Sequence, residues 1–366
     1  MPITVAALRE TAAGERRVAI TPEVAKKLQG KGVRVLLERG AGTAAGFPDS
    51  SYADVEFADA DTVLAQADLL GCVLPPDDAV YGRLREGVVV IGQLRPYGAT
   101  DRLAALAARK LTAFSLELLP RTTRAQAMDV LSSQAAVAGY RAMLIAAEAA
   151  PKFFPMLTTA AGTIRPSRVL VIGAGVAGLQ AIATARRLGA QTEGYDVRPE
   201  TREQVESLGA KFIELGVSAA GSGGYARELS AEERAAQQQA LAEHLKSVDV
   251  IVSTAAVPGR PAPKILTKAM VEGMKPGALI VDLAAEGGGN CELTRPGERV
   301  EHGGVTILGP LNLPAGAPLH ASEMYARNFY NFVELLQKDG ALQLDFDDEL
   351  VAKSCLTRAG EVVFKG

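Results

Sequence analysis

The residues best suited to chemistry form a glycine-rich turn near the middle of the 366-residue chain. The turn reads Gly173-Ala174-Gly175-Val176-Ala177-Gly178, and it follows the apolar run Arg168-Val169-Leu170-Val171-Ile172. Glycines at this spacing permit a tight turn, let backbone N–H groups approach a pyrophosphate, and allow the next helix to pack closely. The N-terminus of that helix adds positive potential toward phosphates. The turn therefore predicts a dinucleotide site whose phosphate-binding residues are Gly173, Gly175, Val176 and Gly178.

An acidic residue at the end of the next predicted strand supports this interpretation. Asp196 lies about 20 residues after the turn, where a carboxylate that binds the ribose hydroxyls is expected. Such a carboxylate repels a 2′-phosphate and favours NAD(H), whereas Arg198 weakens that preference because an arginine here can bind a 2′-phosphate. We expect NAD(H) as the cofactor, with Asp196, Val197 and Arg198 at its adenosine ribose.

A second group of candidate residues lies between two apolar elements, in residues 121–134. On one interpretation this is an ordinary loop and helix start, with Asp129 as the cap. On the other, the segment lies at the C-terminal edge of the first sheet, where its polar side chains fix a nicotinamide carboxamide and ribose. The residues alone leave both interpretations open, and the candidates are Arg121, Gln126, Asp129 and Ser132.

Short apolar runs alternate with helical patterns in both halves of the chain, which is typical of parallel α/β domains. In the first half, strands are expected at residues 3–8, 33–38, 69–74, 88–94 and 112–118. In the second half, six parallel strands are expected at 169–172, 192–195, 211–213, 248–253, 279–283 and 305–308. The sequence therefore predicts an α/β fold of two Rossmann-like parallel-sheet domains with a nucleotide cleft between them.

Two long helical segments set the expected domain boundaries. Residues 129–148 form a helix that crosses to the second domain, and residues 322–338 form one that packs back on the first. We predict a discontinuous N-terminal α/β domain of residues 1–134 plus 311–366, and a Rossmann NAD(H)-binding domain of residues 135–310. The polar segment 216–246 is expected to be a lid, with a capping box from Ser230 to Glu233.

Composition excludes several classes of protein. The net charge is −3 and no basic cluster stands out, so nucleic acid is not an expected partner. Three scattered cysteines argue against a disulfide framework and against a metal site. The N-terminus has no signal-peptide layout, and the longest apolar stretch, 169–185, is glycine-rich and contains polar residues. We therefore expect a soluble chain that binds no metal.

Longer motifs make the chain resemble the NAD(H)-binding component, the alpha-1 subunit or domain I, of proton-translocating NAD(P) transhydrogenases. They cover essentially the whole chain: Pro120-Arg121, Arg124-Ala125-Gln126, Met128-Asp129, Leu131-Ser132-Ser133, Ala138-Gly139-Tyr140-Arg141, Thr254-Ala255, Pro258-Gly259-Arg260-Pro261-Ala262-Pro263, Asp282-Leu283-Ala284, Gly288-Gly289-Asn290-Cys291-Glu292, Asp345-Phe346-Asp347-Asp348 and Arg358-Ala359-Gly360-Glu361. Gly223-Gly224-Tyr225-Ala226 resembles the mobile loop that closes over bound nucleotide in that family.

The resemblance implies residue roles and partners. Arg121, Gln126, Asp129 and Ser132 would position the nicotinamide without acid–base chemistry, and Gly224, Tyr225, Thr254 and Ala255 would contact NAD(H). Hydride would pass directly to NADP(H) on a separate beta subunit, beside Gln126, and separate membrane subunits, including alpha-2, would translocate protons. Because no membrane span follows the closing motif, we expect a cytoplasmic homodimer that is peripheral to the membrane and attached through those partners.

An amino-acid dehydrogenase resembling alanine dehydrogenase is the main alternative, because the family shares its fold with those enzymes. Arg16-Arg17-Val18-Ala19-Ile20-Thr21-Pro22 resembles the segment that carries their substrate-carboxylate arginine. They also place a lysine and a histidine where this chain has Pro75-Pro76 and Arg95-Pro96, and His244 is expected in a solvated helix. The missing acid or base fits transfer between two nicotinamides, which moves no proton at the reacting carbons. A non-catalytic NAD-binding module is the remaining alternative.

Overall fold

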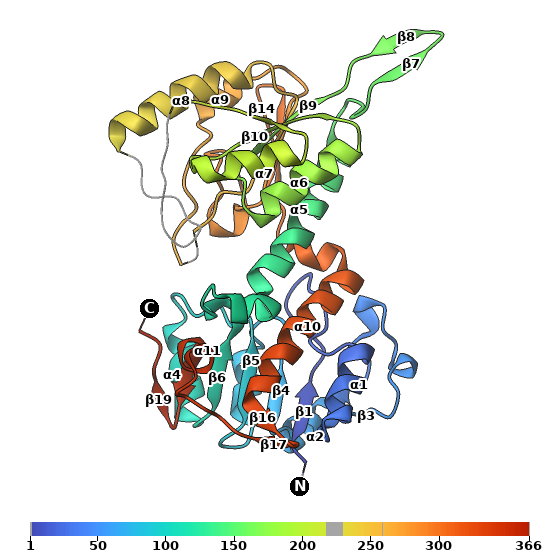
Figure 1. Ribbon diagram of the computed structural model, residues 1–366, viewed down its shortest axis with the longest axis vertical. Helices are drawn as coiled ribbons and strands as arrows, with labels where there is room; N and C mark the ends of the chain where they lie inside the picture. The colour runs from blue at the N-terminus through green and yellow to red at the C-terminus, as the bar shows by residue number, and fades with distance from the viewer. Residues whose placement is uncertain (1, 217–229, 258, 366) are drawn as a thin grey trace. The chain divides into compact units, whose positions relative to one another are not determined.

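The structure is a computed structural model that describes residues 2–216, 230–257 and 259–365. The chain divides into two compact units, shown in Figure 1. The N-terminal unit comprises Met1–Gln134 and Pro314–Gly366, and the central unit comprises Ala135–Leu313. The return to the first unit therefore lies at Pro314, whereas the sequence-based division places it at residue 311.

The N-terminal unit contains an eight-stranded sheet in the order β19-β18-β6-β5-β4-β1-β2-β3. β1 to β6 pair in parallel, and β18 and β19 extend the β6 edge in antiparallel fashion. The strands are β1 (Thr4–Ala7), β2 (Arg34–Glu38), β3 (Glu56–Ala58), β4 (Leu69–Gly71), β5 (Val89–Gly92), β6 (Thr112–Ser115), β18 (Cys355–Arg358) and β19 (Glu361–Val362). All five strands expected in this half are present, and the predicted parallel α/β class is confirmed.

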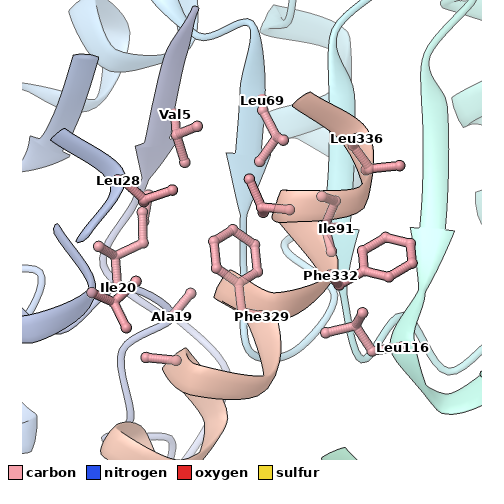
Figure 2. Close-up of a cluster of buried hydrophobic side chains, with 14 of the residues drawn as sticks. Val5, Ala19, Ile20, Leu28, Leu69, Ile91, Leu116, Phe329, Phe332 and Leu336 are labelled. Atoms are coloured by element: carbon pink, nitrogen blue, oxygen red, sulfur yellow. The ribbon is translucent and has the colours of Figure 1, made fainter. Parts of the chain in front are cut away.

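Helix α10 (Pro318–Leu336) covers one face of this sheet (Figure 1). Figure 2 shows Phe329 and Phe332 of α10 beside Leu69 of β4 and Ile91 of β5, in a cluster of buried side chains. The helix begins four residues before the predicted 322–338, because Pro318 occupies its first turn, where proline is favourable. The other helices of the unit are α1 (Pro22–Gly30), α2 (Ala60–Gln66), α3 (Asp78–Arg83), α4 (Thr100–Ala108), α11 (Glu349–Ser354) and the 3-10 helices η3 (Leu116–Leu118) and η4 (Thr123–Met128).

The central unit contains a seven-stranded sheet in the order β11-β10-β9-β12-β13-β15-β14. Its six predicted strands are parallel, as expected, and β14 pairs antiparallel with β15 at one edge. The strands are β9 (Arg168–Ile172), β10 (Gln191–Tyr195), β11 (Lys211–Phe212), β12 (Val250–Ser253), β13 (Leu279–Asp282), β14 (Arg299–His302) and β15 (Val305–Leu308). Its helices include α6 (Val176–Arg187), α7 (Arg202–Ser207), α8 (Ala231–Leu245) and α9 (Lys268–Glu272).

Helix α5 (Val130–Ala149) contains the boundary between the units. Val130 belongs to the core of the N-terminal unit, and Ala142, Met143 and Ala146 belong to a core of the central unit. Among the described residues, α5 is the one helix long and apolar enough to cross a membrane by length and composition, with a mean hydropathy of 1.2. Its contribution to two protein cores accounts for that composition.

Candidate functional site

The glycine turn joins β9 to α6, and two of its glycines are required by close contacts. Gly173 has a φ of +94°, and a Cβ there would lie 2.6 Å from Thr254 Oγ1. A Cβ on Gly178 would lie 1.8 Å from the Gly173 carbonyl oxygen. Both positions therefore exclude any side chain, in agreement with the roles that the spacing predicts for a tight turn and a close helix.

Gly175 is different, because nothing lies within 4 Å of a Cβ built on it. It is the N-cap residue of α6 and supplies no side chain to the first backbone N–H groups of that helix. Val176, the next residue, is 43% exposed. The helix N-terminus thus faces open space that a pyrophosphate can enter, so the turn fits a dinucleotide.

The Asp196 carboxylate is buried and holds the turn from the end of β10. Its Oδ2 accepts a hydrogen bond from Ala174 N over 2.8 Å. Its Oδ1 accepts from Arg198 N and Arg198 Nε, both over 2.9 Å, and Arg198 Nη2 donates to Oδ2 over 2.7 Å. Asp196 and Arg198 are therefore a neutralising pair, and Val197 between them packs against a core of the central unit.

Thr254 and Ala255 follow β12 and lie beside the turn, as the predicted cofactor residues require. Thr254 Oγ1 donates to the Gly173 carbonyl oxygen over 2.9 Å. Ala255 is held on both sides by the buried Asn290, whose Oδ1 accepts from Ala255 N over 3.0 Å and whose Nδ2 donates to Ala255 O over 2.7 Å. Asn290 is not among the predicted site residues, because its role depends on contacts 35 residues away.

The loop after β13 is organised by the fully buried Asp282. Its Oδ1 accepts from Ala284 N over 3.0 Å, and its Oδ2 accepts from Cys291 N over 3.0 Å and Thr294 Oγ1 over 2.6 Å. Burial raises the pKa of the Cys291 thiol, so this cysteine remains protonated and is a poor nucleophile. The loop is therefore a scaffold for Asn290.

In the N-terminal unit, the structure shows that Asp129 caps α5. Its Oδ1 accepts from Ser132 N over 2.9 Å, and its Oδ2 accepts from Ser132 Oγ over 2.6 Å. The capping interpretation of Asp129 is thus confirmed, and it is compatible with a cofactor role for the same residue. The predicted pair Asp129 and Ser132 lies together at the start of the helix.

A pocket of about 270 Å³ brings three of the predicted nicotinamide-side residues together. Arg121, Gln126 and Asp129 line it, with Glu117 and backbone from the same segment. The Glu117 carboxylate accepts hydrogen bonds from Arg95 N and Ser115 Oγ, both over 2.8 Å. The pocket therefore offers a cation, an amide and two structurally engaged carboxylates.

Several other expectations can be compared with the structure. His244 is not solvated as predicted: its side chain is 19% exposed and its Nε2 lies 2.6 Å from Glu193 Oε2, because α8 packs over β10. The capping box from Ser230 to Glu233 is confirmed. Gly224 and Tyr225 lie outside the described residues. Among residues 2–216, 230–257 and 259–365, no group of three or more His, Cys, Asp or Glu side chains could hold a metal ion.

Comparisons with known proteins extend over nearly the whole chain. Residues 6–138 match the family described as alanine dehydrogenase/PNT, N-terminal domain, and residues 142–365 match the corresponding C-terminal domain. The chain is 45% identical to the first segment of NAD(P) transhydrogenase subunit alpha from Rhodospirillum rubrum, over 97% of this chain and 96% of that one. It is similar to a solved transhydrogenase from Sinorhizobium meliloti, with a TM-score of 0.91 and 44% identity over 98% and 100% of the two chains. A solved L-alanine dehydrogenase shares the fold, with a TM-score of 0.81 and 24% identity over 99% and 97%.

Proposed function

Because the chain belongs to the alanine dehydrogenase/PNT family, we propose that it is the NAD(H)-binding alpha-1 subunit of a proton-translocating NAD(P) transhydrogenase. Hydride passes directly between NAD(H) held by this chain and NADP(H) held by a beta subunit. The observation that carries this choice of enzyme is the near full-length identity to the first segment of a transhydrogenase alpha subunit. The glycine turn supports the choice of cofactor.

The residues of the central unit suit the adenosine and pyrophosphate parts of NAD(H). Gly175 and Val176 leave the first N–H groups of α6 accessible to phosphate oxygens. Asp196 lies next to the turn and offers carboxylate oxygens to ribose hydroxyls once Arg198 yields its bonds. Thr254 and Ala255 complete the edge of the site beside Gly173. Gly224 and Tyr225 remain proposed contacts of the same nucleotide.

The pocket of the N-terminal unit suits a group that positions a ring and moves no proton. Bound NAD(H) supplies the hydride chemistry. Arg121 and Gln126 offer donors to a carboxamide, while the Asp129 carboxylate is engaged by Ser132 and the Glu117 carboxylate by Arg95 and Ser115. Neither acid is arranged as a general base, so orientation accounts for the rate in this proposal.

The environment of Arg17 argues against the alanine dehydrogenase alternative. Its guanidinium is buried and donates to Glu15 through Nε over 2.8 Å and through Nη2 over 2.6 Å. Nη1 donates to Gln134 Oε1 over 2.9 Å. A substrate carboxylate would have to displace the Glu15 carboxylate, which is itself fully buried. The chain therefore satisfies internally the arginine that an amino acid would require.

The proposed assembly contains a homodimer of this chain, the NADP(H)-binding beta subunit and the membrane alpha-2 subunit, with the chain at the cytoplasmic side of the membrane. The hairpin β7–β8 (Leu157–Thr159 and Gly162–Ile164) supports a second copy as partner. It extends away from the sheet of its own unit (Figure 1), and every residue of both strands is exposed. Met156 and Ile164 are 64% and 45% exposed, which is unfavourable unless another chain covers them.

Two assays test this function. The first mixes the chain with a purified transhydrogenase NADP(H)-binding domain, NADH and an NADP⁺ analogue, and the expected result is direct hydride transfer. If NADH binds but no hydride moves, a non-catalytic NAD-binding module is the better description. The second follows NADH oxidation with pyruvate and ammonia, where robust activity would establish an amino-acid dehydrogenase instead.

A further inference from the structure

We propose that Arg124, Asn328 and Asn331 are positioning residues for hydride transfer, because together they fix the 3-10 helix η4 that carries Gln126. The inference rests on the proposed function. These three side chains are not among those that line the pocket beside η4. They act through the backbone of the segment that presents the lining residues.

The first attachment is an ion pair between Arg124 and Asp348. Arg124 Nη1 donates to Asp348 Oδ1 over 2.9 Å, and Nη2 donates to Oδ2 of the same carboxylate. Two parallel hydrogen bonds fix the direction of a guanidinium as well as its distance. The hydrogen bond from Arg124 lowers the pKa of Asp348, so the carboxylate is ionised at neutral pH.

Asp348 is in turn fixed to the body of the N-terminal unit. It is the N-cap of α11 and accepts a hydrogen bond from Leu350 N over 2.9 Å. Leu350 and Val351, in the first turn of that helix, are buried in the core. Arg124 therefore ties η4 to an element whose own position is set by core packing.

The second attachment is to the carbonyl oxygen of Ala127. Asn328 Nδ2 donates to it over 2.8 Å, and Asn331 Nδ2 donates over 2.9 Å. The two asparagines are three residues apart on α10, so they lie on one face of the helix. Since Phe329 and Phe332 anchor α10 in the core, both lone pairs of this carbonyl are engaged by a rigid element.

The two attachments lie on either side of Gln126, at residues 124 and 127. η4 is a six-residue 3-10 helix that buries Ala125 and Met128, and its hydrogen-bond geometry is weaker than that of an α-helix. Fixing it in advance avoids an ordering cost when the partner docks. A displacement of about 1 Å in a reacting group can slow a reaction on the order of 100-fold, so the attachments bear on rate.

The test compares hydride-transfer rates in the docked complex with the NADP(H)-binding domain. Arg124→Ala and Asn331→Ala are each expected to slow transfer at saturating NADH roughly tenfold, and the double variant more. The dissociation constant for NADH should change less than about twofold, because the turn and Asp196 lie in the central unit. The matched control is Arg34→Ala, which removes a bidentate pair with Glu56 in the same unit and should change neither quantity.

Two further variants separate the ion pair from the cap. Asp348→Asn keeps a residue that caps helices but loses the charge, so it should reproduce Arg124→Ala. Arg124→Lys keeps the charge without the planar fork and should be intermediate. Amide hydrogen exchange within residues 121–129 should accelerate in the slow variants and stay unchanged in Arg34→Ala.

The outcomes are distinguishable. Wild-type transfer with unchanged rates in all Arg124 and Asn331 variants would overturn the positioning role. A parallel fall in melting temperature and NADH affinity would also overturn it, in favour of general stability. If the wild-type chain transfers no hydride at all, the proposed function fails, and exchange within η4 still reports whether the attachments order it.

Discussion

The Asp196 carboxylate has two structural partners, the backbone of the glycine turn and the Arg198 side chain. The arginine that could accept a 2′-phosphate is thus paired with the acid that repels it. Selection of NAD(H) then depends on both residues, since the carboxylate excludes the phosphate directly and also engages the guanidinium. This arrangement reconciles the two opposing signals in the sequence.

A pair of variants tests this at the residue scale. Asp196→Ala should raise the Kd for NADH on the order of tenfold, through lost hydrogen bonds to the ribose, and should improve binding of NADPH. The double variant Asp196→Ala/Arg198→Ala should lose the gain for NADPH while still binding NADH weakly. Titration of nucleotide fluorescence measures both constants, because the chain has no tryptophan to interfere. If NADPH binds the two variants equally well, Arg198 has no part in selectivity.

Glu10 predicts a pH dependence of stability. Burial raises the pKa of its carboxyl to about 7, although Val73 N and Leu74 N donate to it over 2.6 and 3.2 Å. Between the unfolded value of 4.5 and about 7 the folded chain binds the extra proton, so stability falls as pH rises through this window. Relative to Glu10→Gln, the wild type should lose up to roughly 3 kcal/mol between about pH 5 and pH 8. Urea unfolding of both proteins at several pH values checks this, and a pH-independent difference would contradict it.

Sequence patterns locate the residues that come in runs and overlook those that act over long separations. The glycine turn and Asp196 are local patterns with a known physical reason. Asn290 and Asn328 are single polar residues whose partners lie 35 and 201 residues away. No spacing rule predicts such contacts, because they depend on how whole elements pack.

At the scale of elements, the turn between β9 and α6 separates folding from binding. Gly178 is needed for packing, since its Cβ would overlap the Gly173 carbonyl oxygen, whereas Gly175 faces open space with a φ of −80° that any residue adopts. Gly139 plays a comparable packing role on α5, where a Cβ would lie 2.0 Å from the Ala177 carbonyl oxygen of α6. The two kinds of glycine should respond differently to the same substitution.

Gly178→Ala is expected to lower the melting temperature by about 10 °C, because relieving a backbone overlap costs about 3 kcal/mol or more. Gly175→Ala should leave the melting temperature within about 2 °C of wild type. It should nevertheless raise the Kd for NADH at least tenfold, as an order of magnitude, because the new methyl group displaces phosphate from the N–H groups. Tight NADH binding by Gly175→Ala would show that the pyrophosphate lies elsewhere.

The strands illustrate which elements a pattern can predict. Those in the middle of each sheet are continuous apolar runs buried on both faces, and the sequence predicts nearly all of them. β3, β14, β18 and β19 are short edge strands with exposed polar residues, and no run indicates them. The predicted strand 112–118 ends at Ser115, because Leu116–Leu118 turns into η3 and directs Leu116 to the core.

At the scale of the whole molecule, the division into units follows from α5 and α10, whose long helical patterns are visible in the sequence. The hairpin β7–β8 is not, since its strands are three residues long and lack periodicity. Its exposed apolar residues have no explanation within the described residues of a single chain. A second copy that covers them would account for their exposure and for the homodimer that the family resemblance implies.

This proposal makes a quantitative prediction for the pair Met156→Ser/Ile164→Ser. Burying one such side chain at an interface contributes about 1.5–3 kcal/mol, and a symmetric dimer counts each side chain twice. The double variant should therefore raise the dimer dissociation constant by at least 100-fold as an order of magnitude, which sedimentation velocity at micromolar concentration detects as a shift to monomer. Leu311→Ser, at a residue 48% exposed in the same unit, is the matched control and should remain dimeric. A variant that sediments like the wild-type dimer would place the interface on another surface, and a monomeric wild type would remove the homodimer from the proposal.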